Sequence, residues 1–342
     1  MQKNAGVRDL SCKGDQEVKQ IIMKILVVFT GGTIGSSIVN DTADVDPGAA
    51  KGLLGMYPDV EFVCVELFSM LSENSTIDTL EKLCNFMLRI DYSDYDGVIV
   101  THGSDTLGYT AALLGVAMSC VKIPVMITAA DYVLSDRRSN GIDNFCGCVD
   151  FIGEFSKGKH SYAGVYAVWK NRGDYVRVHR AARLEQADFN DEFRSFGGEC
   201  FGTIRSGRFV KNKTASDFAE SGQPGMSLLG KRITLSRKIL LLKSYAGADF
   251  DCVSIQDKDA VIVQTYHSGT VCTVGDNTSF VKFAKRCSEH NVDVYVFPIR
   301  DRGYIYRSSK EIPWDIVKPL FNVGECEAYA RLLLKYGEIR RS

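Results

Sequence analysis

The sequence predicts an α/β protein with two domains, built around a mainly parallel sheet. Short apolar runs alternate with amphipathic stretches along most of the chain, the rhythm of strand–helix–strand units with right-handed crossovers. The chain has 342 residues, a length that corresponds to about two domains of ordinary size. With 45% hydrophobic and 24% charged residues, it has the composition of a folded protein with a sizeable core.

Charge, hydropathy and cysteine content limit the binding partners, the cellular compartment and the metal sites that we expect. The net charge of −1 gives no electrostatic footprint for nucleic acid or a membrane surface. No run of 18 apolar residues occurs, so no membrane span is expected. Eleven cysteines without a secretory signal favour free thiols in a reducing compartment, so we expect a cytoplasmic protein. Cys146 and Cys148 are spaced C-x-C without a second pair nearby, which argues against a zinc site.

The chain divides into four parts by composition. Residues 1–22 lack a continuous apolar core, so we do not expect a secretory signal; they form a disordered leader, or Met23 is the natural start. A larger N-terminal domain is predicted at 23–215, a linker at 216–236 and a smaller C-terminal α/β domain at 237–342.

In the first half, apolar runs predict buried strands and apolar residues at helical spacing predict helices. Ser75 or Thr76 is placed to cap the first of these helices. The predicted strands are 24–30, 61–68, a strand from residue 96 that ends at Thr101 or His102, and 123–131. The predicted helices are 77–88, 105–120 and 135–152.

In the second half, the pattern changes and then returns. Residues 162–183 alternate at period two around the turn Asn171-Arg172-Gly173, which predicts a β-hairpin. Residues 197–236 are rich in Gly, Ser and Lys and are expected to form a linker with short strands. The strands then predicted are 238–247, 259–269 and 293–299, with helices at 277–290 and 326–336.

Two predicted strands end in turns that combine glycine with hydroxyl groups. The first is Thr30-Gly31-Gly32-Thr33 and the second is Thr101-His102-Gly103-Ser104-Asp105. Ligands of open parallel sheets bind at the carboxyl ends of strands, and glycine lets backbone N–H groups come close to them. The turns match neither a P-loop, nor a G-x-G-x-x-G motif, nor a nucleophile elbow.

Structural interpretations of these residues stay open at this point. A Gly-Gly turn after a strand is common, and Ser104-Asp105 before a helix is typical of an N-cap. His102 has no neighbouring His or Cys that would complete a metal site, and it is equally consistent with a hydrogen-bonded polar residue of the turn.

The two turns together are more specific than either alone. "TGGTIG", followed about seventy residues later by "THGSDTLGYTAALL", resembles the L-asparaginase/glutaminase amidohydrolase family. The stretches "PVMITAADYVLSDRRSNGIDNF" and "NVGECEAYARLLL" resemble that family's next strand and helix and its C-terminal helix. The resemblance implies an asparaginase-like fold of two α/β domains, a homodimer or homotetramer with sites between subunits, and catalysis without a metal ion or organic cofactor.

The resemblance also implies a role for each matching residue. Thr33 matches the nucleophile that attacks the side-chain amide carbon and forms an acyl-enzyme. Ser104 and Asp105 match the family's second threonine and aspartate, and Ser72 matches the serine that holds the substrate's α-carboxylate. Asp105 is also expected to pair with the α-ammonium group. Gly32 and Gly103 belong to the substrate-binding turns, where backbone N–H groups near Ser104 form the oxyanion hole.

Four departures from the family pattern affect the expected activity. Ser104 replaces a threonine, and Arg183 stands at the position expected for a lysine; arginine cannot serve as a base, although it could orient Ser104 and Asp105. Lys170, across the hairpin, is a second candidate for the lysine, with an exposed hairpin lysine as the alternative. The segment after "TGGTIG" has no tyrosine between residues 34 and 56, and the C-terminal turn at 266–270 lacks the asparagine of a Gly-Val-Gly-Asn-like sequence.

These departures favour a slow or re-targeted amidohydrolase over a highly tuned one, because loss of acid–base help changes rates by roughly 10²–10⁴-fold. The leading hypothesis is hydrolysis of L-asparagine or a related amide. A non-catalytic amino-acid-binding protein that keeps Ser72 and Asp105 is the first alternative. The amidase subunit of a tRNA-dependent amidotransferase ranks below it, because that subunit usually carries an extra N-terminal domain and the leader is too short to form one.

Overall fold

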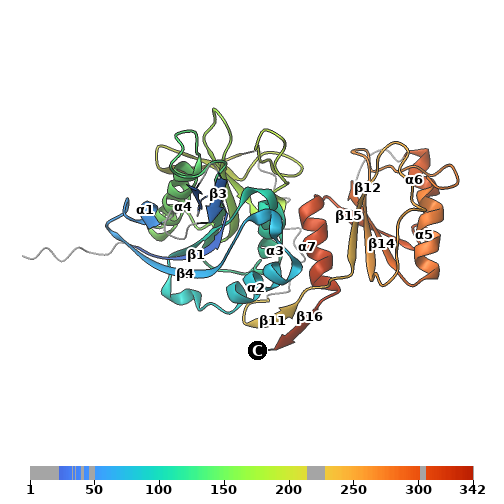
Figure 1. Ribbon diagram of the computed structural model, residues 1–342, viewed down its shortest axis with the longest axis horizontal. Helices are drawn as coiled ribbons and strands as arrows, with labels where there is room; N and C mark the ends of the chain where they lie inside the picture. Colours follow the sequence, from blue (N-terminus) through green and yellow to red (C-terminus); the bar gives the residue numbers. More distant parts are fainter. Residues whose placement is uncertain are drawn as a thin grey trace, which may run out of the picture.

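The computed structural model describes residues 23–32, 34, 36–39, 42–45, 51–213, 228–300 and 306–341. Thr33, the expected leader and most of the expected linker lie outside these residues. The described chain forms two α/β parts, a larger and a smaller one, with helix α7 (Glu325–Lys335) between them (Figure 1). The predicted α/β class, with a mainly parallel main sheet and a smaller parallel C-terminal sheet, is therefore confirmed.

The larger part is built on a mixed sheet. Within the described residues, eight strands lie in the order β10-β9-β8-β7-β6-β5-β1-β4. Pairing is parallel from β7 to β4 and antiparallel from β7 to β10, so the predicted hairpin is confirmed. The strands are β1 (Met23–Gly31), β4 (Val60–Met70), β5 (Gly97–Thr101), β6 (Pro124–Thr128), β7 (Gly164–Lys170), β8 (Val176–Arg180), β9 (Gly202–Arg205) and β10 (Arg208–Lys211).

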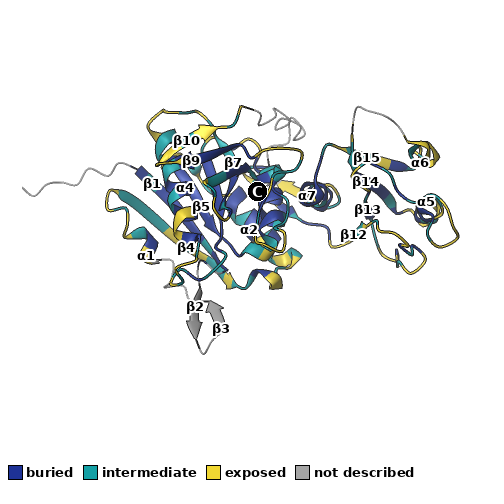
Figure 2. Ribbon diagram, turned by 90° about the horizontal axis from the view of Figure 1, so that it is seen from above, coloured by how far each residue is buried: buried dark blue, intermediate teal, exposed yellow. Residues whose placement is uncertain are grey.

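Helices cover both faces of this sheet, which explains the continuous apolar runs of its strands. In β1, Leu26 and Val28 join the core under α2 (Ile77–Leu88) and α3 (Leu107–Ala117), whereas Ile25 and Val27 join the core under α4 (Gly141–Ser156). Figure 2 shows β1 and β5 almost entirely buried. Thr76 caps α2 through a reciprocal capping box with Thr79, as the sequence predicts.

The smaller part is a parallel sheet between two helical layers. Within the described chain its strand order is β12-β13-β14-β15. Apolar residues of α5 (Phe280–Glu289) cover one face and those of α7 cover the other. The strands are β12 (Ile239–Lys243), β13 (Ala260–Gln264), β14 (Asp293–Ile299) and β15 (Val317–Phe321).

Several short elements complete the described chain. A ribbon of β11 (Lys231–Thr234) and β16 (Glu338–Arg341) joins the two ends of the smaller part beside α2. The remaining elements are β2 (Ser36–Val39), β3 (Thr42–Val45), α1 (Lys51–Leu54), α6 (Arg307–Glu311) and the 3-10 helices η2 (Ser72–Asn74), η3 (Tyr92–Asp94), η4 (Ser104–Thr106) and η5 (Ala181–Arg183).

Some boundaries differ from the sequence prediction. The helix expected from residue 135 begins only at Gly141, because Asp131 and Asn140 each bind the other's backbone N–H through a side-chain oxygen and hold 131–140 in a loop. The helix expected from residue 105 begins at Leu107, after the η4 turn. The sequence analysis does not predict strand β15, because its sequence "VKPLF" contains a proline. In the structure this strand is only partly buried.

Helix α7 joins the two parts through ion pairs and a hydrogen bond made by two of its glutamates. Tyr109 of α3 donates a 2.5 Å hydrogen bond to Glu325 Oε1, and the Nζ of Lys243 in β12 lies 2.8 Å from Glu325 Oε2. The Nη1 atom of Arg183 lies 3.3 Å from Glu327 Oε2. Because Glu327 is only 2% exposed, its charge depends on such partners.

Glu185 is a third carboxylate at this junction, and its pKa predicts that the stability of the protein depends on pH. Burial, then the neighbouring Glu325 carboxylate, raises the pKa of Glu185 to about 7, while Arg183 opposes the rise. The folded-state pKa thus exceeds the unfolded one, so the contribution of this group is fully present below about pH 4.5 and is lost as pH rises through 7, by about 3 kcal/mol at most. Glu185→Gln, which stays neutral, should therefore melt about 5 °C higher than the parent at pH 8 and level with it near pH 4.5.

The measurement is a series of thermal melts between pH 4.5 and 8. Glu289→Gln is the control, because Glu289 is an exposed carboxylate at the end of α5. Parallel melting curves for the parent and Glu185→Gln across this range would contradict the prediction.

Candidate active site

The turn after β1 touches the turn after β5 through backbone atoms. Gly31 and Gly32 have φ values of 96° and 77°, a region that favours glycine. A Cβ atom on Gly32 would lie 2.3 Å from the Gly103 nitrogen and 2.4 Å from the His102 carbonyl oxygen. The Gly32 N–H donates to the Met70 carbonyl at 2.9 Å, and the Thr30 hydroxyl donates to the Thr101 carbonyl at 2.7 Å. Glycine at 32 is therefore required for the ends of these strands to meet.

Ser72 and Asp105 meet beside these glycines. Ser72 is only 4% exposed, and its hydroxyl donates to Asp105 Oδ2 at 3.3 Å. A Cβ atom on Gly103 would lie 2.3 Å from Ser72 Oγ, so this glycine leaves the space that Ser72 fills. The structure thus brings together Gly32, Ser72, Gly103 and Asp105, and it places Ser104, half-buried, at the start of η4 between the last two.

His102 is a structural residue of the turn. Its Nδ1 lies 2.8 Å from the Gly103 carbonyl, which can only accept, so Nδ1 carries the proton. Its Nε2 then accepts from the Thr110 hydroxyl at 3.0 Å. Burial lowers the pKa of His102, which keeps the ring neutral. Both ring nitrogens are used in this way, which agrees with the interpretation of His102 as a hydrogen-bonded polar residue.

This edge can hold a zwitterion. The exposed Asp105 carboxylate can pair with an ammonium group. The Ser72 hydroxyl, which here donates its one proton to Asp105, can donate it to a ligand carboxylate instead if it turns away from Asp105. Thr33, the predicted nucleophile, lies outside the described residues. Its neighbours along the chain, Gly32 and the buried Ile34, belong to the turn and to the core beneath it.

The comparison with protein families shows to which family this chain belongs. The family described as "Asparaginase, N-terminal" matches residues 24–216, more than half of the chain. The chain belongs to the asparaginase family. The match includes both glycine turns, Ser72 and the hairpin, so all the predicted site residues of this asparaginase-family chain lie within it.

Curated relatives point to a second kind of family member. A glutamyl-tRNA(Gln) amidotransferase subunit from Methanosphaera stadtmanae is 25% identical over 262 residues, which cover 73% of this chain and 58% of that protein. The corresponding amidotransferase subunit from Methanobrevibacter smithii is 30% identical over 196 residues, covering 53% of this chain and 42% of that protein. The chain spans about half the length of the curated relatives it matches.

Solved structures confirm the asparaginase-like fold. The thermostable L-asparaginase from Thermococcus kodakarensis superimposes with a TM-score of 0.74 at 16% identity, covering 93% of this chain and 94% of that chain. L-asparaginase I from Vibrio cholerae gives a TM-score of 0.70 at 21% identity, covering 91% and 92%. Within the described residues, no helix has the length and apolar character needed to cross a bilayer.

The structure does not place Arg183 where the family resemblance suggests. Its Nη1 donates to the Asn322 carbonyl and pairs with Glu327, and its Nη2 donates to the Phe196 carbonyl at 3.2 Å. The guanidinium therefore lies against α7 rather than against Ser104 and Asp105. The physical reason is the set of acceptors on this side: two backbone carbonyls and the buried Glu327 carboxylate, which Arg183 shares with Arg331 of the same helix.

The second candidate for the family lysine has a partner of its own. The Nζ atom of Lys170 lies 2.6 Å from Asp143 Oδ2 on α4, and both side chains are partly exposed. This is the contact of an ordinary surface ion pair.

The sequence analysis does not predict the other charged and polar groups that lie near Asp105. Asp191 lies close enough to Asp131 and Asp105 for both carboxylates to raise its pKa, after the larger effect of burial, while Arg172 lowers it. Arg172 Nη2 donates to the Tyr132 hydroxyl at 3.4 Å. These groups come from the loops after β6, β7 and β8, so only the sheet topology brings them together.

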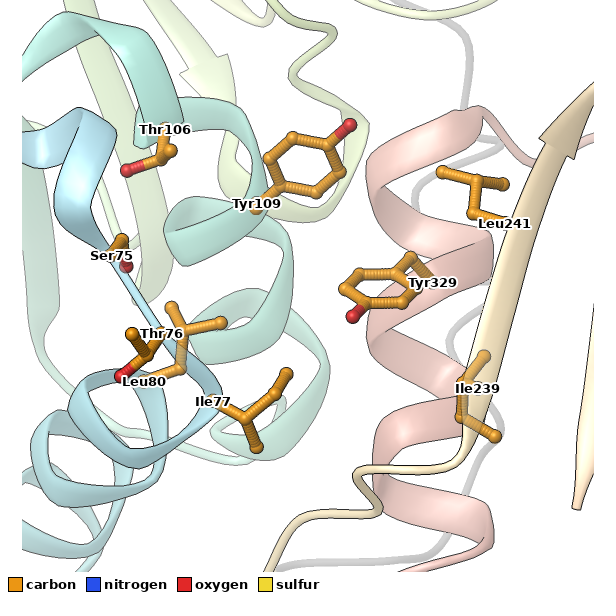
Figure 3. Close-up of a pocket in the computed structure, with 9 residues that line it drawn as sticks. All are labelled: Ser75, Thr76, Ile77, Leu80, Thr106, Tyr109, Ile239, Leu241 and Tyr329. Carbon is orange, nitrogen blue, oxygen red and sulfur yellow. The ribbon is translucent and has the colours of Figure 1, made fainter. Parts of the chain in front are cut away.

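A pocket of about 460 Å³ borders the site (Figure 3). It lies between the larger part and α7 with β12, and Tyr109 and Tyr329 meet edge to face across it, with ring centroids 5.9 Å apart. Uncharged side chains line it: Ser75, Thr76, Ile77, Leu80, Thr106, Tyr109, Ile239, Leu241 and Tyr329. It adjoins Asp105 through Thr106, but it is separate from the zwitterion-binding edge.

Proposed function

We propose that this asparaginase-family chain hydrolyses the side-chain amide of L-asparagine to L-aspartate and ammonia. The observation that carries the proposal is the meeting of the Gly32 turn with Ser72 and Asp105, because it joins the turn that bears Thr33 to groups suited to an amino acid. Ser72 would hold the α-carboxylate and Asp105 the α-ammonium group.

The proposed reaction has two steps. The Thr33 hydroxyl oxygen bonds to the amide carbon, the C–N bond breaks, and the hydroxyl proton goes to the leaving nitrogen as ammonia departs. Water then attacks the ester carbon, the ester C–O bond breaks, and a proton of that water goes to the Thr33 oxygen. Backbone N–H groups near Ser104 would stabilise the oxyanion in each step. No metal ion or organic cofactor is part of the proposal.

The proton relay differs from the pattern that the family resemblance implies. Arg183 pairs with Glu327, and Lys170 pairs with Asp143. We therefore propose turnover slower than that of a member with a lysine at the site. The same observation favours the alternative of an amino-acid-binding protein that lacks turnover.

A second candidate is an amide-donor subunit that acts on glutamine with a partner protein. Its support is the identity of 25% and 30% to the two glutamyl-tRNA(Gln) amidotransferase subunits. For either enzyme we propose a cytoplasmic location and a homodimer or homotetramer. We also keep the proposed domain boundaries at 23–215 and 237–342.

The test is ammonia release from L-asparagine and L-glutamine by the purified protein, with calorimetric binding of L-aspartate alongside. Faster release from asparagine supports the proposal, and faster release from glutamine supports the amide-donor subunit. Aspartate binding without ammonia release from either amide would establish the binding protein.

A further inference from the structure

Residues 183–186, named here the connecting segment, lie between the proposed active site and helix α7. Arg183 pairs with Glu327 of this helix. Glu185 accepts the Glu325 backbone N–H at the first turn of α7, and a Cβ atom on Gly324 would lie 1.8 Å from its Oε1. The connecting segment up to Glu185 therefore holds the junction between the two parts of the molecule.

Gln186, the last residue of the connecting segment, contacts the Asp105 turn. The Gln186 side-chain amide donates through Nε2 to the Asp105 carbonyl and accepts the Gly108 N–H through Oε1 at 2.9 Å. One side chain thus spans η4 and the first turn of α3. A Cβ atom on Gly108 would lie 2.5 Å from Gln186 Oε1 and 2.9 Å from the Cys326 sulfur, so α7 packs against the same turn.

Helix α3 needs a partner at this position. The first N–H groups of a helix have no acceptor within it. The N-cap residue Thr106 donates its hydroxyl to the Ser72 carbonyl at 3.0 Å and does not cap the helix. Gln186 supplies the missing acceptor from outside, and its donor fixes the peptide of Asp105 at the same time.

We propose that Gln186 is a positioning residue that holds the Asp105 turn in the geometry required to bind the substrate's ammonium group. This inference rests on the proposed function, and it extends it by a residue that touches no substrate. Glu185 contacts the first turn of α7, and the next residue, Gln186, contacts the Asp105 turn. Two adjacent residues therefore connect the position of α7 with the position of Asp105.

The chemistry of the side chain is specific. Glutamate at 186 would keep an acceptor for Gly108 but would lose the donor to the Asp105 carbonyl. Methionine has similar length and volume but offers neither bond. The two variants therefore separate the donor from the acceptor without opening a large cavity.

The experiment measures kcat and KM for L-asparagine and the affinity for L-aspartate in the parent, Gln186→Met and Gln186→Glu. Gln256→Met, in an exposed loop, is the control. We expect both variants to raise KM and the aspartate Kd about tenfold, with a smaller change in kcat, because one hydrogen bond that orients a charged group is lost. Hydrogen exchange at the Gly108 amide should accelerate in Gln186→Met and stay near the parent in Gln186→Glu.

Unchanged KM and aspartate affinity in both folded variants would overturn the role of Gln186, whatever the exchange rates. A loss of thermal stability with KM unchanged would do the same, because it would assign Gln186 to packing alone. A parent protein that neither releases ammonia nor binds aspartate would refute the proposed function instead. If Gln186→Met does not fold, Gln186→Glu alone decides between these outcomes through KM and aspartate affinity.

Discussion

Gly32→Ala is expected to abolish ammonia release and aspartate binding and to destabilise the protein by about 3 kcal/mol. The backbone at Gly32 has a φ of 77°, which costs an alanine about 1–2 kcal/mol. The new Cβ would also lie 2.3 Å from the Gly103 nitrogen, and backbone atoms cannot rotate out of its way. The two turns must therefore separate, which displaces Asp105 and the turn that bears Thr33.

Thermal melting and aspartate calorimetry check this prediction. A loss of about 6 °C in the melting temperature accompanies a change of this size in a chain of this length. Gly52→Ala is the matched control, since a Cβ atom at this position of helix α1 would have no atom within 4 Å and its φ is not positive. A Gly32→Ala protein with the melting temperature and aspartate affinity of the parent would show that the two turns do not need to touch.

Asp105→Asn is expected to weaken L-aspartate binding by about 10- to 100-fold. The substitution keeps the shape of the side chain but removes the negative charge that would pair with the ammonium group. A hydrogen bond to a charged group contributes about 1.5–3 kcal/mol. Because Asp105 is exposed and Asn can still accept from the Ser72 hydroxyl, the folding free energy should change little.

Calorimetry against L-aspartate measures the effect, with Asp276→Asn as control. Asp276 is an exposed carboxylate in the smaller part, paired with Lys282. Equal aspartate affinities for Asp105→Asn and the parent would remove Asp105 from the binding site.

Most of the fold could be predicted because periodicity and burial agree. In β1, alternate residues join different cores, and this produces the continuous apolar run seen in the sequence. The prediction was wrong where side chains compete with the backbone. Asp131 and Asn140 hold the loop before α4, so this helix begins at Gly141 and not at the predicted residue 135.

The site was predictable only in part, for a different reason. Glycine and hydroxyl residues at strand ends carry a local signature, and the structure brings Gly32, Ser72, Gly103 and Asp105 together. Arg183 pairs with Glu327, which is 144 residues away in the chain. Gln186 donates to the carbonyl of Asp105, which is 81 residues away. Local sequence contains no information on which of these contacts forms.

Whether Thr33 is the nucleophile is decided by measuring ammonia release from L-asparagine by the parent, Thr33→Ala and Thr33→Ser. We expect release by the parent, a loss of about 10⁴-fold or more in Thr33→Ala, and measurable release in Thr33→Ser, which keeps a hydroxyl. Equal rates in the parent and in Thr33→Ala would contradict the assignment of Thr33 as the nucleophile. No release from any of the three, with L-aspartate still bound, would contradict the assignment of asparaginase activity.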